Sequence, residues 1–254
     1  MTDKTVKKPK VGGKLDAAAP ALMSLGIALA AIGFVLAFTV AGLVNGAAVN
    51  EPQVINGTVV ANKLLISQKI FYWHVPVAIA SFGAIAFAAY YAIRFLMTKQ
   101  AFFDMRAKLC MEVGLAFILC TMASGVLWTR YEWGVWWTWE PRLTTYFILM
   151  LMVIAYFILR NAVEDPERRA TYASVFGILI FIDVPICFMI TRLIPSSVHP
   201  VIFRTDSGLS PDMLVPFLLS LFGMALIAFG LYRFRLRTQV LEDEITRLSD
   251  ALED

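Results

Sequence analysis

Six apolar runs dominate this sequence, and each has about the length needed to cross the hydrocarbon core of a bilayer as a helix. A transmembrane helix needs about 20 mostly apolar residues. The runs are Ala21 to Val44, Ile70 to Met97, Leu109 to Trp128, Leu143 to Leu159, Tyr172 to Ile194 and Met213 to Tyr232. Apolar residues make up 59% of the 254 residues, whereas a soluble domain has about half. The sequence therefore predicts an all-α, polytopic integral membrane protein with about six transmembrane helices.

The positions of Lys and Arg between the runs predict the orientation of the chain. Cytoplasmic loops of membrane proteins carry an excess of these residues. With a cytoplasmic N-terminus, only six of the 22 Lys and Arg fall on the outer side: Lys63, Lys69, Arg130, Arg142, Arg192 and Arg204. Both termini are therefore predicted to be cytoplasmic. The same bias accounts for the net charge of +3, so this charge does not indicate a nucleic-acid partner.

This orientation divides the chain into three parts. Residues 1–20 form a cytoplasmic N-terminal segment, and residues 21–232 form the transmembrane domain, with an outer loop at 129–145. Residues 233–254 form a cytoplasmic tail in which apolar residues recur at helical spacing, so we predict an amphipathic helix there.

The outer loop between the third and fourth runs is unusually rich in tryptophan. The stretch WGVWWTWEPRLTT, residues 133–145, holds four of the six tryptophans: Trp133, Trp136, Trp137 and Trp139. The chain has two histidines, His74 in FYWHVP and His199 in IPSSVHPVIF, and both fall on the same predicted side. A tryptophan belt occupies both membrane interfaces rather than one loop. A single histidine is often a packed polar residue of the bundle, but two on the aromatic side favour a ligand role.

A large planar iron cofactor would explain this combination. Neutral imidazoles can ligate haem iron axially, and indole rings can cover an apolar macrocycle. Arg130 and Arg142 flank the tryptophans and suit the haem carboxylates, although headgroup contact explains each of them equally well. The sequence contains no C-x-x-C-H motif, so the haem b would be non-covalent and exchangeable. It also lacks H-E-x-x-H and C-x-x-C, which argues against a zinc site.

The tryptophan stretch resembles a known signature of the haem-handling membrane proteins of cytochrome c maturation, which reads W-G-x-W-W-x-W-D-x-R-L-T. The matching residues are Trp133, Gly134, Trp136, Trp137, Trp139, Arg142, Leu143 and Thr144. His74 and His199 stand at the places of the family's two histidines. The resemblance covers most of the chain and is to the CcmC type, the haem exporter protein C family.

This resemblance implies a role in haem binding and transfer rather than an enzymatic reaction. In that family, haem is held at the outer face of the cytoplasmic (inner) membrane by two axial histidines and the tryptophan-rich loop. It is then presented to a periplasmic haem chaperone of the CcmE type. The implied membrane partners are ABC transporter subunits of the CcmA and CcmB types and a small protein of the CcmD type.

The sequence also leaves other hypotheses open. Glu140 stands where the signature has Asp and is followed by Pro141, so no specific carboxylate role is transferred to it. A loop of this kind also resembles the CcsA-type cytochrome c synthases, which keep a further pair of histidines that this chain lacks. A membrane transporter that binds no haem is a third hypothesis, with Asp183 inside the fifth run as its main polar candidate. A hydrogen bond from Asp183 to a neighbouring helix is the simpler explanation of that residue.

Overall fold

The computed structural model describes residues 14–42, 53–55, 58–60, 68–194 and 209–253. Its long helices are α1 (Lys14–Thr39), α3 (Phe71–Thr98), α4 (Ala101–Trp133), α5 (Pro141–Ala162), α6 (Pro166–Leu193) and α7 (Pro211–Glu253). The 3₁₀ turn η2 (Gln68–Ile70) precedes α3, and β1 (Gln53–Ile55) pairs with β2 (Thr58–Val60) as a short antiparallel hairpin. All six long helices are long and apolar enough to cross a membrane. The predicted all-α membrane fold is therefore confirmed.

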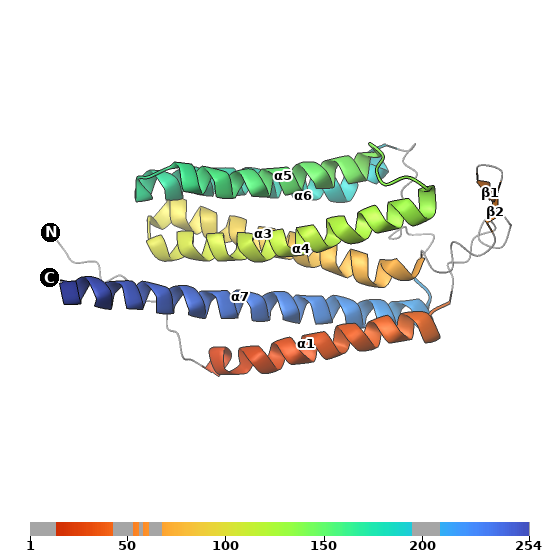
Figure 1. Cartoon of the computed structure of the whole chain (residues 1–254), viewed down its shortest axis with the longest axis horizontal. Helices are drawn as coiled ribbons and strands as arrows, with labels where there is room; N and C mark the ends of the chain where they lie inside the picture. The colour runs from red at the N-terminus through yellow and green to blue at the C-terminus, as the bar shows by residue number, and fades with distance from the viewer. Residues whose placement is uncertain (1–13, 43–52, 56–57, 61–67, 195–208, 254) are drawn as a thin grey trace.

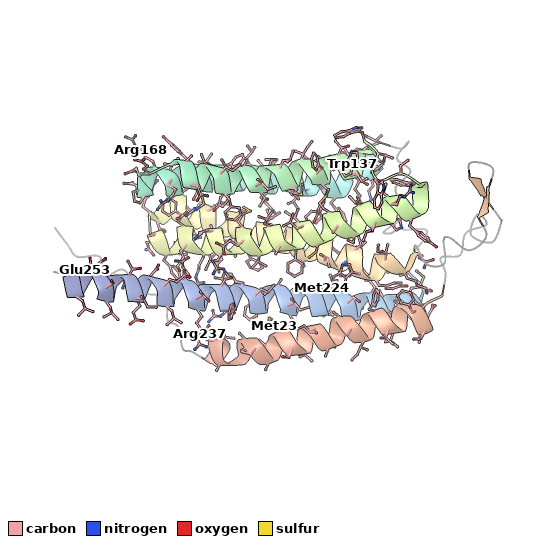
Figure 2. All side chains as sticks on the ribbon, viewed as in Figure 1. Met23, Trp137, Arg168, Met224, Arg237 and Glu253 are labelled. Carbon is pink, nitrogen blue, oxygen red and sulfur yellow. The ribbon has the colours of Figure 1, made fainter. Side chains whose placement is uncertain are left out.

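The helices lie side by side in layers (Figure 1). Helices α5 and α6 form one side, α3 and α4 the middle, and α7 follows with α1 outermost. Figure 2 shows Trp137 at one end of the bundle and Arg168 and Glu253 at the other. We call the Trp137 end the outer end and the opposite one the inner end, following the predicted orientation.

Local sequence signals keep the connections at the inner end short. Lys99 adopts a left-handed conformation (φ 56°) between α3 and α4, and its backbone N–H donates to the carbonyl of Phe95 at 2.7 Å. Asp165 caps α6 by accepting a hydrogen bond from the Arg168 N–H at 2.7 Å, and Pro166 occupies the first helical position. Such short turns make α3 and α4, and likewise α5 and α6, antiparallel neighbours.

The main core lies between α3, α4, α5 and α6. It contains the fully buried residues Ile85, Ile118, Leu149, Val153 and Ile180. Many large apolar side chains face outward instead. An apolar exterior around an apolar core is expected when the surrounding solvent is lipid.

Helix α1 packs on α7 through glycines. A Cβ atom on Gly223 of α7 would lie 2.6 Å from the backbone nitrogen of Ala30 and 2.7 Å from the carbonyl oxygen of Gly26. A Cβ atom on Gly33 would lie 2.8 Å from the carbonyl oxygen of Pro216. Small residues of this kind allow close backbone approach, which is a common way for transmembrane helices to associate.

Ion pairs and a long helical extension mark the inner end. Arg160 of α5 donates to both carboxylate oxygens of Asp104 of α4, at 2.6 and 2.8 Å. Arg235 of α7 donates to Glu112 of α4 at 2.8 Å. Beyond these pairs α7 continues without a break to Glu253 and projects past the other helices (Figure 1). The predicted tail is therefore helical, with the exposed apolar residues Leu241, Ile245, Leu248 and Leu252.

Candidate functional site

The tryptophan loop is shorter in the structure than the predicted 129–145. Helix α4 runs to Trp133, which is its last residue, and ends at Gly134 with a φ of 75°. Glycine adopts this left-handed conformation without steric cost. The non-helical connection is therefore limited to residues 134–140, because nothing in the sequence before Gly134 breaks the helix.

The outer end of α4 contacts the loop directly. The Arg130 Nη1 atom donates a hydrogen bond to the carbonyl of Gly134. The Arg130 guanidinium carbon also lies 5.5 Å from the centre of the Trp136 ring, within cation–π range. Arg130 thus joins the helix end to the indole that follows it.

Glu140 provides the cap that begins α5. Its carboxylate accepts hydrogen bonds from the backbone N–H groups of Arg142 at 2.9 Å and Leu143 at 3.1 Å. Pro141 occupies the first helical position. An aspartate in the place of Glu140 would also cap a helix. The departure from the signature therefore preserves a structural role for the carboxylate.

The loop presents aromatic rings to the outside of the bundle. Trp136 and Trp139 are 59% and 72% exposed. Trp137 lies edge-on to Trp139, with ring centres 5.7 Å apart, and to Phe147 of α5 at 5.5 Å. The Trp137 indole N–H is buried and has no hydrogen-bond acceptor among the described residues. Trp133 contacts Trp128 of α4 instead, at 5.1 Å between ring centres.

His74 lies in the first turn of α3 and is half-buried. Its Nδ1 atom lies 2.9 Å from Ser124 Oγ of α4, and the neighbouring Gly125 leaves space for the imidazole ring. No described residue forms a hydrogen bond with His74 Nε2. The sequence reasoning missed Ser124 and Gly125. A histidine in an apolar span needs a polar partner, but the sequence does not indicate which serine or threonine provides it.

Arg142 connects the loop to the histidine side of the site. Its Nη2 atom donates to the carbonyl of Phe188 of α6 at 3.3 Å. It also lies close enough to His74 and to Arg192 to interact with both electrostatically. The charge of Arg142 therefore reaches His74, whereas Arg130 lies with Trp136 at the end of α4.

Three further residues singled out in the sequence are not placed at this site by the described structure. His199 and Arg204 lie outside the described residues. Asp183 accepts a hydrogen bond from Cys187 Sγ at 3.5 Å, one turn along the same helix rather than on a neighbouring one.

Comparison with known proteins agrees with this architecture. The family model for Heme exporter protein C, CcmC, matches residues 14–250. Heme exporter protein C of Bradyrhizobium diazoefficiens is 30% identical over 185 residues, which cover 71% of this chain and 69% of that protein. The protein of the same name from Escherichia coli K12 is 26% identical over 175 residues, 69% of this chain and 71% of that protein. The one from Paracoccus denitrificans is 32% identical over 139 residues, 55% and 54% of the two chains. The chain therefore belongs to the Heme exporter protein C family, multi-pass membrane proteins with a role in haem handling for cytochrome c maturation.

Proposed function

We propose that this protein holds haem b at the outer end of the bundle, on the outer side of the cytoplasmic membrane, and presents it to a periplasmic haem chaperone. In this proposal His74 and His199 are the axial ligands of the iron. The tryptophans of the 133–139 stretch supply the surface on which the ring rests. ABC transporter subunits of the CcmA and CcmB types and a CcmD-type protein are the proposed membrane partners, as the family implies.

The observation that carries the proposal is the state of His74. One ring nitrogen is engaged by Ser124, and no described residue occupies the other. An axial ligand of iron needs this arrangement, because one nitrogen must offer a lone pair while the other is held by a neighbouring group. A histidine with a purely structural role would instead be expected to use both nitrogens in the bundle.

The aromatic loop supports the same assignment. Two largely exposed indoles, Trp136 and Trp139, present apolar surface that a flat macrocycle can cover. The unpaired indole N–H of Trp137 offers a hydrogen bond to an anionic group. Haem combines an apolar ring with two carboxylates and so complements both features.

Two cations could receive the haem carboxylates. Arg130 and Arg142 each donate to one backbone carbonyl. A guanidinium carries five N–H donors, so each retains the capacity to bind a carboxylate as well. Because Arg142 lies near His74 and Arg130 near Trp136, the two cations lie beside different parts of the proposed site.

The test is the absorption spectrum of the purified protein co-expressed with its chaperone. Wild type should show a low-spin haem, and His74→Ala and His199→Ala should each lose it or convert it to high spin. Trp73→Phe is the matched control, because Trp73 precedes His74 but is 41% exposed on the helix surface. Trp136→Ala and Trp137→Ala should weaken haem retention without changing the spin state. An unchanged spectrum in both histidine variants would refute the ligand assignment.

A further inference from the structure

We infer that Ser124 and Gly125 of α4 form a seat that sets the tautomer and the ring plane of His74, so that Nε2 is the nitrogen offered to iron. This inference rests on the proposed function, in which His74 is an axial ligand. Ser124 and Gly125 would then be positioning residues, since they act on the haem only through the histidine.

The direction of the hydrogen bond follows from the surroundings of Ser124. Its hydroxyl oxygen lies 2.9 Å from the carbonyl oxygen of Cys120 and 3.0 Å from that of Thr121. Carbonyl oxygens only accept hydrogen bonds, so a bond to either of them uses the single hydroxyl proton of Ser124. With the proton used in this way, the Ser124 oxygen accepts from His74 across the 2.9 Å contact. The proton of the neutral imidazole then lies on Nδ1, and the lone pair lies on Nε2.

The burial of Ser124 strengthens this preference. The residue is only 8% exposed, so water does not readily replace the histidine as its partner. In the opposite tautomer Nδ1 would accept from the Ser124 hydroxyl, which would then give up its hydrogen bonds to the Cys120 and Thr121 carbonyls.

Gly125 restricts the ring in a different way. A Cβ atom at this position would lie 3.1 Å from His74 Cε1 and 3.9 Å from Nδ1. The imidazole edge therefore occupies the space that a side chain at residue 125 would fill. A side chain at residue 125 would push the imidazole a few tenths of an ångström away from its place beside Ser124. The hydrogen bond and the missing side chain together fix both the position and the rotation of the ring.

Fixing a ligand in this way affects the metal it holds. Partners that orient a ligating histidine change metal affinity by about 10- to 100-fold when they are removed. A hydrogen bond from Nδ1–H also makes the imidazole a stronger electron donor. Loss of this hydrogen bond is expected to favour ferrous over ferric iron and so to raise the reduction potential of the haem.

The experiment compares haem-loaded variants purified in the same detergent. Haem transfer to apomyoglobin gives the dissociation rate, and a redox titration followed at the α band gives the potential. Ser124→Ala should release haem about tenfold faster and show a raised potential, whereas Ser124→Thr should restore both values because it keeps the hydroxyl. Gly125→Ala should also release haem faster, although Ser124 is intact. Thr129→Val is the matched control, since Thr129 is fully buried and, among the described residues, its hydroxyl donates only to the helix carbonyl of Gly125 at 2.9 Å.

The outcomes separate the seat from the proposed function. If His74→Ala keeps the wild-type spectrum, His74 is not a ligand and the proposed function is wrong. If His74→Ala loses the spectrum but Ser124→Ala matches Thr129→Val in both rate and potential, His74 remains a ligand and the seat is refuted. A Ser124→Thr variant that behaves like Ser124→Ala would also refute it, because the hydroxyl would then not be the cause. Should Ser124→Ala yield no folded protein, Gly125→Ala and Ser124→Thr still decide the question through the same two measurements.

Discussion

The glycine contact between α1 and α7 predicts a large effect from one added methyl group. In Gly223→Ala the new Cβ would lie 2.6 Å from the Ala30 nitrogen and 2.7 Å from the Gly26 carbonyl oxygen. Both neighbours are backbone atoms of α1, so no side-chain rotation can relieve the contact. The two helices must separate by roughly 1 Å before these atoms reach ordinary van der Waals distance.

Two opposing effects set how far Gly223→Ala lowers the free energy of unfolding. Overpacking a close contact costs about 1 to 3 kcal/mol. Replacing glycine by alanine inside a helix returns roughly 0.5 to 1 kcal/mol of helix propensity. Separation of the helices also weakens the neighbouring contact of Gly33 with Pro216, one of the other close approaches along the interface. The net expectation is therefore a destabilisation of about 1 to 2 kcal/mol.

The assay is reversible unfolding in mixed micelles, with the free energy of unfolding taken from the transition. Gly83→Ala is the matched control, because a Cβ atom at Gly83 of α3 meets nothing within 4 Å. That variant should be neutral or slightly stabilised, as expected from helix propensity alone. If Gly223→Ala unfolds with the same free energy as Gly83→Ala, α1 does not approach α7 at this point and the described helix pairing is wrong.

Other features give predictions of the same kind. Arg160→Met removes the partner of Asp104 in a pair whose side chains are only 10% and 15% exposed; it should destabilise by about 3 kcal/mol, and adding Asp104→Leu should recover much of the loss in the same unfolding assay. If the double variant recovers none of the lost free energy of unfolding, an unpaired Asp104 carboxylate is not the cause of the loss. Glu140→Ala removes the α5 cap and should cost about 1 kcal/mol, whereas Glu140→Asp should be close to neutral; equal losses would argue against capping. The predicted orientation can be tested with a membrane-impermeant maleimide on spheroplasts. Val135→Cys should be labelled above the background of the parent protein, and Ser249→Cys should be labelled only after the membrane is opened. The reverse pattern would show that the topology is inverted.

The sequence predicted the helices well because the bilayer imposes their length and composition. All six apolar runs correspond to helices. Five of the six runs are shorter than the corresponding helices, as the third shows: the predicted Leu109 to Trp128 becomes Ala101–Trp133. A helix retains its backbone hydrogen bonds after it leaves the hydrocarbon, so charged residues such as Asp104 and Arg130 belong to it. Apolar composition therefore indicates where the lipid is, but not where the helix ends.

The contacts between helices were much harder to predict. His74 and Ser124 are 50 residues apart, and their contact depends on how α3 rotates against α4. The apolar pattern cannot fix this rotation, because a membrane helix is apolar on the faces toward lipid as well as toward the core. The spacing of Gly26 and Gly33 was a usable signal for the α1 interface. The capping role of Glu140 before Pro141 was also within reach, since an acidic residue followed by proline is typical of a helix start.

The same structural details explain how a loop can present exposed tryptophans without being loose. Residues 134–140 are held at one end by the left-handed Gly134 and the Arg130 contact to its carbonyl, and at the other by the Glu140 cap. The orientation of Trp136 and Trp139 is therefore largely set before any ligand arrives. A surface that is already ordered loses less conformational entropy when it binds. The cap and the glycine should thus influence haem retention through the loop, even though neither needs to touch the haem. If the cap has this role, Glu140→Ala should release haem faster than its small loss in the free energy of unfolding would explain.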